Sequence, residues 1–378
     1  MPDDRLEKRT LFTRVCVPGR GNMSSKKQLP LVEASGKPYE MGKMIGKKCA
    51  PKALVYRKGI AEGIKYYTGF DWPRAVDRAK LYLPYAEEFY PDFVDEIRGY
   101  SDGAKMPFDE AFTLCCHELL SPQGFRGCTD VAVSGDVTDD GRVLAAHNED
   151  WSNNALETVV FLHAKPQGKP EFFTTSYAGL LPSCGINSAG IGLTGNALEP
   201  NDVRIGIPKV FPVRKIMEAR RIGEALESAL PEDRASSYNN IVSDKNGEMY
   251  SLEGSATSCA WLYAIDGYLV HTNHYTADKM QRYESYPSSI SCSVFRYNRA
   301  LRLIEDQLGS VTVDSLKTLL ADHVNKPGSI CRHAVSGMHP LDVSETIFSV
   351  IYDLTHLEAH VLKGKPCSST WVKHSLRK

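Results

Sequence analysis

The stretch Arg126-Gly127-Cys128-Thr129-Asp130 lies where the character of the sequence changes. Before it, apolar residues recur at helical spacing, and after it short apolar runs alternate with turn residues, as is typical of strands. A cysteine directly after a glycine, at the head of a strand, is the arrangement that a chain needs in order to cut itself there. Cleavage would leave Cys128 as a new N-terminus that carries both a thiol nucleophile and an α-amine base.

The same dipeptide has a simpler interpretation, because free cysteine is among the residue types most often buried in a core. Gly127 favours cleavage, since a residue without a Cβ adopts strained backbone angles and lets the thiol approach its carbonyl. The reaction would be an N-to-S acyl shift followed by hydrolysis of the thioester. Polar clusters elsewhere in the chain decide between the two interpretations.

The pattern divides the 378 residues into three segments. Residues 1–28 are polar and aperiodic, which predicts a disordered tail. Residues 29–127 are predicted to be mainly helical, and residues 128–378 to contain sheets and paired helices. Strand-rich stretches flanked by helices indicate an α+β fold in which helices cover the sheets.

The individual elements are predicted from periodicity and turn signals. Helices are expected within 38–120 and at 213–230, 295–308 and 313–323. Strands are expected at 131–133, 143–146, 158–162, 171–175, 191–194, 240–242, 248–253, 261–265, 268–271, 346–352 and 358–362. A turn at Asp266-Gly267 is expected to join two neighbouring strands, and the last two strands are expected to form a hairpin.

Composition excludes several classes of protein. A net charge of −1 leaves no electrostatic footprint for nucleic acid, and no uncharged run approaches the ~18 residues of a membrane span. No secretory signal is evident, so a cytoplasmic location is expected. The ten cysteines include no C-x-x-C pair, which indicates reduced thiols and no zinc site. We expect neither a metal nor another cofactor, and self-association into a homo-oligomer stays open.

Polar residues gather where two apolar runs end and in one loop. In the cluster 147–150, His-Asn-Glu-Asp, the aspartate Asp150 could hydrogen-bond the α-amine and orient it. Asn273 follows another strand and supplies an amide donor of the kind found in oxyanion holes. Arg332 lies in a loop and could hold a carboxylate in bidentate geometry. The first of these clusters, taken alone, is also explained as a solvated turn.

These clusters alone are also compatible with two other functions. A metal-assisted hydrolase could be built on His147, Asp150, His271 and His274, although a strand end is not the helical face that such histidine spacing usually exploits. A ligand-binding protein without catalysis could keep the same fold with an unreactive cysteine. A conventional pair of Cys331 with a histidine two residues later is disfavoured, because residues so close in sequence rarely face each other productively.

In this order, the motifs resemble the acyl-coenzyme A:6-aminopenicillanic-acid acyltransferase family, the autoproteolytic relatives of isopenicillin N acyltransferase. The resemblance covers the chain from about Pro38 to Pro366. The matching motifs are Gly127-Cys128-Thr129, Asn148 with Asp150, Asn187-Ser188-Ala189-Gly190, His271-Thr272-Asn273-His274, Ser329-Ile330-Cys331-Arg332 and Ile351-Tyr352-Asp353.

The resemblance implies an N-terminal-nucleophile hydrolase fold, a four-layer αββα sandwich that matures by cleavage between Gly127 and Cys128. It implies that Cys128 is the nucleophile, that Asn273 is an oxyanion donor, and that Asp150 and Arg332 organise the site around the new amine. The candidate substrate-binding residues are Thr129, Asp130, Asn148, Glu149, Asn196 and His274.

Two departures from the family pattern concern charge. Asp130 stands where the fungal pattern has a small hydroxyl residue, and Glu149 stands where it has tryptophan. Both add negative charge, which favours a cationic or amine-bearing substrate. We therefore predict hydrolysis of a small non-peptide amide through an acyl-thioester on Cys128, with a small amide or acyl donor as the partner. Acyl transfer to an amine is the alternative.

Overall fold

The computed structural model describes residues 28–121, 127–180, 182 and 184–377, so that nearly all of the predicted tail, 1–28, lies outside the described residues. The predicted helical region is confirmed, with three short interruptions at 69–71, 90 and 105–107 and a 3-10 turn at Lys80–Tyr82. Its helices are α1 (Pro38–Thr68), α2 (Trp72–Ala79), α3 (Leu83–Phe89), α4 (Pro91–Ala104) and α5 (Phe108–Leu120). The prediction missed β1 (Leu31–Gly36), which precedes them.

Eight strands form the first sheet, in the order β1-β4-β5-β6-β7-β8-β9-β10. Its other members are β4 (Val159–Pro166), β5 (Phe172–Tyr177), β6 (Cys184–Asn187), β7 (Ile191–Asn196), β8 (Asn239–Asp244), β9 (Met249–Gly254) and β10 (Cys259–Tyr263). The edge strand β1 pairs in parallel with β4, while the other neighbours are antiparallel. The N-terminal segment therefore contributes a strand to this sheet as well as helices.

Six strands form the second sheet, in the order β11-β2-β3-β12-β13-β14. They are β2 (Gly127–Val133), β3 (Leu144–Trp151), β11 (Tyr268–His271), β12 (Glu345–Asp353), β13 (Glu358–Lys363) and β14 (Val372–Ser375). The predicted final hairpin is confirmed as β12 and β13. The remaining helical elements are the 3-10 turn Gly135–Val137, α6 (Asn153–Leu156), α7 (Val210–Ile216), α8 (Ile222–Ala229), α9 (Asp278–Gln281), α10 (Ser291–Glu305) and α11 (Val313–Leu320).

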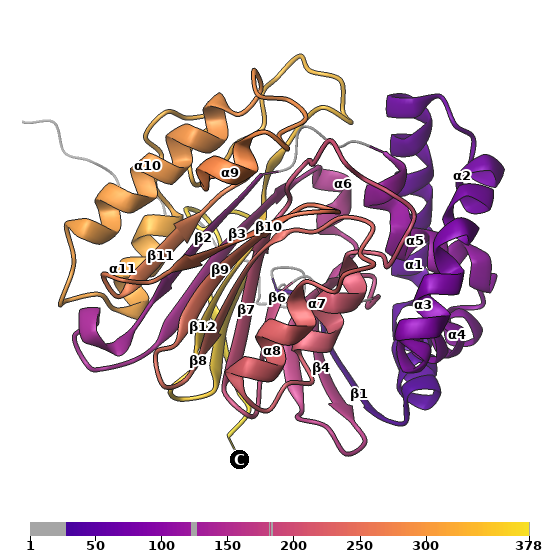
Figure 1. The fold of residues 1–378 in the computed structure, drawn as a ribbon, viewed down its shortest axis with the longest axis horizontal. Helices are drawn as coiled ribbons and strands as arrows, with labels where there is room; N and C mark the ends of the chain where they lie inside the picture. The colour runs from indigo at the N-terminus through magenta and orange to yellow at the C-terminus, as the bar shows by residue number, and fades with distance from the viewer. Residues whose placement is uncertain (1–27, 122–126, 181, 183, 378) are drawn as a thin grey trace, which may run out of the picture.

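Three apolar cores separate four layers of backbone. Phe161 of one sheet and Val350 of the other belong to the core between the sheets. The opposite face of the larger sheet packs on α1, α4, α5 and α7, and that of the smaller sheet packs on α10 and α11. Figure 1 shows α1–α5 gathered on one side of the sheets and α10 and α11 on the other. The predicted αββα sandwich is therefore confirmed. Within the described ranges, no helix is both long and apolar enough to cross a membrane.

The prediction of one continuous helix at 213–230 is wrong. The chain forms two short helices there, α7 and α8, with a break between them. Asn187, at the end of β6, donates from Nδ2 to the carbonyl of Met217 at 3.1 Å and to that of Ala219 at 2.7 Å. These bonds satisfy carbonyl groups that the end of α7 leaves without helical partners. A partner distant in sequence thus stabilises the break.

The prediction that Asp266-Gly267 joins a hairpin is also wrong. The turn forms, with Gly267 at a φ of 79° and its N–H donating to the carbonyl of Ala264 at 3.1 Å. However, β10 before it pairs with β9 in the larger sheet, whereas β11 after it pairs with β2 in the smaller sheet. The chain crosses between sheets here, and turn chemistry alone does not distinguish this crossing from a hairpin.

Helices α1 and α4 approach so closely that their backbones touch. Glycines at four-residue spacing line both helices at the contact, Gly42 and Gly46 in α1 and Gly99 and Gly103 in α4. A Cβ at Gly42 would lie 1.9 Å from the backbone oxygen of Glu96. Only residues without side chains allow this approach, which tightens the packing of the N-terminal segment.

A matched pair of substitutions in α1 tests this packing. Gly42→Ala is expected to lower the free energy of unfolding by about 1–3 kcal/mol or more, because the clash is with backbone and cannot be relieved locally. Gly59→Ala places its Cβ where no atom lies within 4 Å. It is expected to raise stability by about 0.5–1 kcal/mol through helix propensity. Chemical denaturation of both variants measures the difference, and equal effects would contradict the close packing of the two backbones.

Arg214 of α7 links the N-terminal helices to the rest of the chain. Its guanidinium is 1% exposed, bonds to Glu96 of α4 at 3.0 Å, and lies over the rings of Phe93 and Phe172 at 4.6 and 4.8 Å. A buried cation needs such partners, because its desolvation is costly. This contact therefore ties α4 to α7 and β5 across the apolar core.

Candidate active site

Strand pairing places the Gly127–Cys128 bond beside the acidic end of β3. Gly127 is opposite Asp150, and Cys128 is opposite Glu149. Side chains alternate across a strand, so Cys128 and Glu149 share the face toward the larger sheet. The sequence predicted a strand at 131–133 with Cys128 at its head, and the observed strand β2 begins at Gly127.

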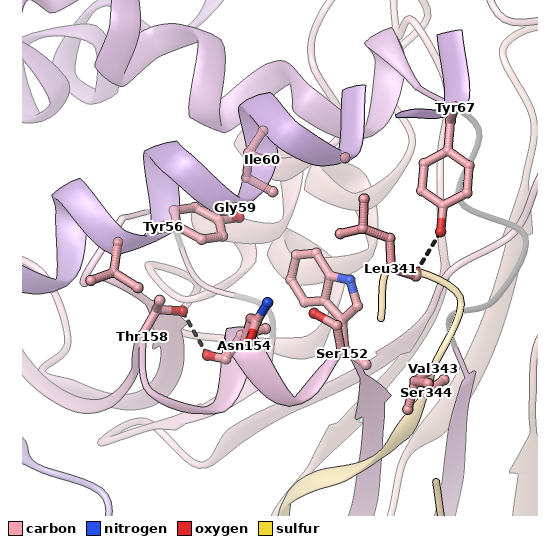
Figure 2. Close-up of a pocket in the computed structure, with 14 residues that line it drawn as sticks. Tyr56, Gly59, Ile60, Tyr67, Ser152, Asn154, Thr158, Leu341, Val343 and Ser344 are labelled. Atoms are coloured by element: carbon pink, nitrogen blue, oxygen red, sulfur yellow. Dashed lines mark hydrogen bonds between the residues drawn. The ribbon is translucent and has the colours of Figure 1, made fainter. Parts of the chain in front are cut away.

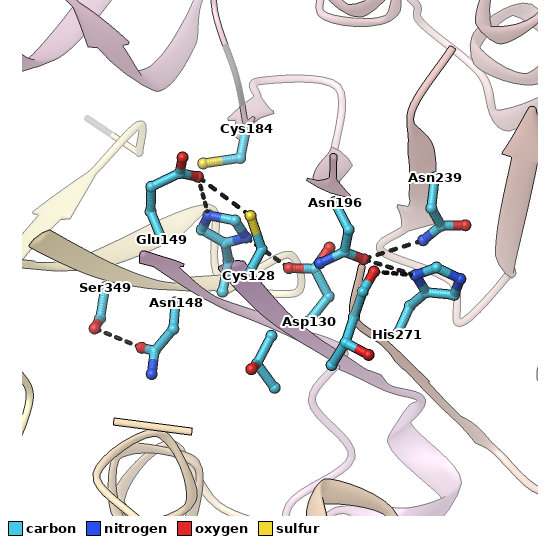
Figure 3. A network of polar contacts seen from close by, with 12 residues as sticks. Cys128, Asp130, Asn148, Glu149, Cys184, Asn196, Asn239, His271 and Ser349 are labelled. Atoms are coloured by element: carbon cyan, nitrogen blue, oxygen red, sulfur yellow. Dashed lines mark hydrogen bonds and ion pairs between the residues drawn. The ribbon is translucent and has the colours of Figure 1, made fainter. Parts of the chain in front are cut away.

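An acidic network lies around the thiol (Figure 3). Cys128 Sγ is 3.7 Å from Glu149 Oε2, and His147 Nε2 is 2.9 Å from the same oxygen. His147 Nδ1 is 2.6 Å from Asp130 Oδ1. On the other side, Tyr177 donates to Glu149 Oε1 at 2.8 Å. The two acidic departures from the family pattern, Asp130 and Glu149, are therefore joined through one histidine.

The charges in this network oppose ionisation of the thiol. Burial raises the pKa of Cys128 well above its ordinary value, and Glu149, Asp130 and Asp150 raise it further. Burial lowers the pKa of His147, but bonding to Asp130 and Glu149 outweighs it and leaves that pKa well above its ordinary value. These effects favour the thiol over the thiolate, so reaction of Cys128 requires a base close to Sγ.

Asn273 and Arg296 hold the backbone of Cys128. The Cys128 N–H donates to Asn273 Oδ1 at 2.7 Å, and Arg296 Nη2 donates to the same oxygen at 2.8 Å. Arg296 Nη1 donates to the carbonyl of Cys128 and, at 3.1 Å, to Thr129 Oγ1. Asn273 Nδ2 donates to the carbonyl of Ala197 at 3.1 Å. The backbone N–H of Ala197 in turn donates to the Cys128 sulfur.

Sequence reasoning missed Arg296. The residue lies in α10, and its side chain is 1% exposed. The other buried residues of that helix are Ser293, Ala300 and Ile304, so the arginine occupies their buried stripe. A charged residue in an otherwise small or apolar stripe was the available signal, because buried charges almost always have a specific partner.

Gly127 fits between Asp150 and Arg332. A Cβ added to this glycine would lie 2.7 Å from Asp150 Oδ2 and 2.8 Å from Arg332 Nη1. Asp150 is fully buried, and its Oδ1 accepts from Thr346 Oγ1 at 2.6 Å. Its Oδ2 has no hydrogen-bond partner among the described residues. A buried carboxylate oxygen without a partner is costly, and this one lies next to the predicted cleavage site.

The pKa of Asp150 is raised to about 6. Burial is the main cause, Arg296 and Arg332 oppose it through their charges, and the bond from Thr346 opposes it as well. The four predicted catalytic residues, Cys128, Asp150, Asn273 and Arg332, are thus brought around one peptide bond.

Two candidate substrate-binding residues lie on the other face of the sheet. Asn148 donates to the carbonyls of Leu320 and Ile330 at 2.8 and 3.0 Å and accepts from Ser349 at 2.6 Å. Figure 3 shows Asn148 and Ser349 on the opposite side of the strand from Glu149. Thr129 shares this outer face, where Arg296 contacts it. These contacts position backbone and do not reach the thiol.

Asn196 and His274 belong to neighbouring networks. Asn196 Oδ1 is 3.0 Å from His271 Nδ1, and His271 Nε2 is 2.9 Å from Glu253. His274 Nδ1 is 2.8 Å from Ser293 Oγ, and burial lowers the pKa of this histidine to about 4. In the part of the chain that the structure describes, the ligand atoms of His147, Asp150, His271 and His274 do not form one cluster. These four residues therefore do not form the metal site of that alternative, although ligand atoms of His147, Cys128 and Glu149 do lie within 4.8 Å of one another.

Sequence similarity links this chain to enzymes that transfer or hydrolyse acyl groups. A family model described as acyl-coenzyme A:6-aminopenicillanic acid acyl-transferase matches residues 137–367. The chain is 26% identical over 346 residues to the 40 kDa form of acyl-coenzyme A:6-aminopenicillanic-acid-acyltransferase of Emericella nidulans, across 89% of this chain and 92% of that protein. It is 25% identical over 226 residues to the beta-alanyl-dopamine/carcinine hydrolase of Drosophila melanogaster, across 53% of this chain and 57% of that one.

Among solved structures, penicillin V acylase from Agrobacterium tumefaciens matches with a TM-score of 0.47 and 13% identity, across 66% of this chain and 87% of that one. The family match begins after Cys128, so it does not itself cover the predicted nucleophile. It does span more than half of the chain. The chain therefore belongs to the acyl-coenzyme A:6-aminopenicillanic acid acyltransferase family and is an enzyme of the acyl-transfer or hydrolase class.

Proposed function

We propose that this protein is a self-processing cysteine amidohydrolase that cleaves a small N-acyl amine through an acyl-thioester on Cys128. One observation carries the proposal: Asp150 Oδ2, buried and without a partner among the described residues, lies beside Gly127 at the predicted cleavage site. A new α-ammonium group on Cys128 would supply the missing donor. Such an N-terminal amine is the base that the buried thiol requires.

Self-cleavage would begin with attack of Cys128 Sγ on the carbonyl carbon of Gly127. The thiol proton passes to Glu149, whose Oε2 lies 3.7 Å away, and His147 holds that carboxylate in place. The C–N bond breaks, the nitrogen takes the proton back from Glu149 to become the α-amine, and a thioester joins Gly127 to sulfur. Water then hydrolyses the thioester and releases the Gly127 carboxylate and the free thiol.

The mature enzyme would repeat this chemistry on a substrate. The α-amine takes the thiol proton, sulfur attacks the acyl carbonyl, and the proton passes to the departing amine. The oxyanion would be stabilised by the second hydrogen of Asn273 Nδ2 and by the backbone N–H of Ala197, which already points at the sulfur. Water attacks the acyl-thioester to complete hydrolysis. An amine acceptor at this step would give transfer instead, as the name of the fungal relative suggests.

The acyl group would lie in a largely apolar pocket between α1 and the residues that follow β3 (Figure 2). Trp151, directly after Asp150, lines this pocket together with Tyr56 and Ile60. Tyr56 stacks on Tyr177, the residue that donates to Glu149, with ring centroids 5.6 Å apart. The pocket thus adjoins the acidic network, and its lining suits an aliphatic or aromatic acyl chain.

Filling the pocket tests this assignment. Gly63 lines the pocket, and a side chain there meets no atom within 4 Å of its Cβ. Gly63→Phe is expected to raise KM for long-chain N-acyl amines by about tenfold and to leave KM for acetyl substrates unchanged. The phenyl ring would displace one to two methylenes of a long chain from the pocket, and their burial changes substrate discrimination by about that factor. Gly223→Phe on α8 is the matched control, since its Cβ position is equally open and lies outside the pocket. Equal losses with short and long chains would contradict the assignment.

The acid limb of the pH profile tests Asp150. Its pKa of about 6 means that the carboxylate becomes neutral as the pH falls through that value. A neutral Asp150 cannot hold the α-ammonium by charge, and that ammonium itself lowers the carboxyl pKa. We therefore expect kcat/KM of the mature enzyme to fall below a pH of about 6 or slightly less. In Asp150→Asn, activity should be low and this limb absent, whereas an unchanged limb would assign the titration to another group.

The proposed function is tested by measuring the polypeptide masses and the amidase activity of one sample. Denaturing mass spectrometry of the purified protein should find two polypeptides, residues 1–127 and 128–378. The same sample should release free amine from a panel of N-acyl amines. An active enzyme that stays in one chain would overturn self-processing, and a cleaved protein inactive on every amide would favour transfer from a thioester donor.

A further inference from the structure

Four side chains that bind soft metals converge outside the active site. They are His323, Cys331, His333 and Cys367, and their ligand atoms all lie within 4.8 Å of one another. They come from three places in the chain: the turn after α11, the loop before β12, and the turn after β13. No C-x-x-C pair marks this cluster in the sequence, because its two cysteines lie far apart in the chain.

The distances in this cluster fit one tetrahedral ion. His333 Nε2 is 3.0 Å from His323 Nε2, 3.7 Å from Cys331 Sγ and 3.6 Å from Cys367 Sγ. Zinc bonds of about 2.0–2.1 Å to nitrogen and about 2.3 Å to sulfur, at tetrahedral angles, place two nitrogens about 3.4 Å apart and nitrogen and sulfur about 3.6 Å apart. The arrangement is therefore close to that of a filled site.

Hydrogen bonding alone accounts poorly for the cluster. A neutral imidazole nitrogen carries either one proton or one lone pair, so it satisfies one partner well. Here three polar atoms surround the same nitrogen of His333. A cation at their centre would satisfy all four side chains at once, and two thiolates with two neutral imidazoles would balance the charge of a divalent ion.

Local backbone structure holds the four ligands in place. The N–H groups of Cys331 and His333 donate to the carbonyls of Asp322 and Pro327, each at 3.0 Å. Cys367 lies in a turn closed by the N–H groups of the next two residues, which donate to the carbonyl of Lys365 at 3.1 and 3.0 Å. Asp322, next to His323, pairs with Arg299 of α10 at 2.7 Å. These bonds fix the backbone that carries the ligands.

The cluster also flanks a predicted catalytic residue. Arg332 stands between two of the ligands, and its side chain points to the opposite side, where Nη1 reaches the space beside Gly127. Its N–H donates to Thr346 Oγ1 at 2.9 Å, and the same hydroxyl donates to Asp150 at 2.6 Å. An ion bound behind this segment would fix the backbone from which the arginine projects.

We propose that His323, Cys331, His333 and Cys367 form a structural zinc site that anchors the Arg332 loop to the C-terminal segment. Four protein ligands close the coordination sphere, so the ion would take no substrate. A set of two sulfurs and two imidazoles at tetrahedral spacing favours zinc over calcium, magnesium or manganese. The proposal stands apart from the proposed function, because it concerns residues that do not contact the thiol.

Metal analysis of the intact protein tests the site. Protein purified under reducing conditions and dialysed with zinc is expected to retain about one zinc per chain by mass spectrometry of the elements. Cys367→Ser, at an exposed position where folding should tolerate the change, is expected to lower zinc affinity by at least about 100-fold in a chelator competition. His323→Gln is a second variant at an exposed position and should act in the same direction. Cys259→Ser in β10 is the matched control and should retain the ion.

Two further readouts separate a zinc site from a hydrogen-bonded cluster and from a disulfide. Cobalt in place of zinc should give the absorption of a tetrahedral thiolate complex in wild type and in Cys259→Ser, and not in Cys367→Ser. Zinc removal should speed amide hydrogen exchange in the Arg332 loop. The proposal is overturned if reduced wild type binds no zinc, if binding survives both ligand substitutions, or if the native protein carries a Cys331–Cys367 disulfide in place of the ion.

Discussion

A Cys128→Ala protein is expected to remain one chain of 378 residues and to lose activity by a factor on the order of 10⁶. The substitution removes the sulfur that would attack the Gly127 carbonyl in processing and the substrate carbonyl in turnover. Asn273 and Arg296 bond to the backbone of Cys128, so their contacts should survive the change. Denaturing mass spectrometry and amine release measure the two losses in one preparation.

Cys184→Ala is the matched control for this prediction. Cys184 is also buried, but its sulfur contacts Thr175 Oγ1 at 2.9 Å and accepts from the Tyr352 hydroxyl at 3.5 Å. This variant should be cleaved and active. If Cys128→Ala is still cut at the same bond, processing is the work of another group or another protease, and Cys128 would keep only a role in turnover.

Asn273→Ala is expected to lower kcat by about 10²–10³-fold. The change removes the acceptor for the Cys128 N–H and for Arg296, and it also removes the amide donor predicted to stabilise the oxyanion. Arg296 would then lose one of its partners in a buried position, so some loss of stability is expected as well. Steady-state kinetics on already cleaved enzyme, with a denaturation curve beside it, separates the two effects.

Asn273→Asp distinguishes the two roles of the amide. The aspartate keeps an oxygen to accept from Cys128 and Arg296 but has no N–H to donate. A loss of kcat close to that of the alanine variant supports the oxyanion role. Near wild-type activity would contradict it and would assign Asn273 to positioning alone. Asn298→Ala, on the same side of the fold but exposed, should leave kcat unchanged.

The spacing of apolar residues along the chain predicts much of the fold. Apolar spacing predicted the helices before residue 121, and the change of period at Cys128 predicted the sheets. The errors came from partners distant in sequence. The carbonyls that Asn187 satisfies after α7, and the exchange of sheets at Asp266-Gly267, depend on contacts that a window of neighbouring residues does not contain.

The site was predictable to a similar degree. Strand ends with polar residues pointed to Asp150 and Asn273, and the loop containing Arg332 was identified by its charge. Arg296 was missed because it lies in a helix whose spacing alone looks ordinary. Asn148 was predicted to be a substrate contact as part of a motif that resembles the family, although it faces the opposite way from its neighbour Glu149. The register of β2 and β3 shows that Asn148 lies on the face of the sheet away from Cys128.

Because β1 pairs with a strand on the other side of the predicted cleavage site, cleavage would change how the protein unfolds. If the bond at Gly127 is cut, β1 and the five helices after it become a separate polypeptide, yet β1 still pairs with β4 and Glu96 still holds Arg214. The uncut chain unfolds in a reaction of one molecule. The cut protein is a heterodimer, whose unfolding is also a dissociation and whose midpoint depends on concentration. Recovery from denaturant should then slow on dilution for the mature enzyme and be independent of dilution for its precursor.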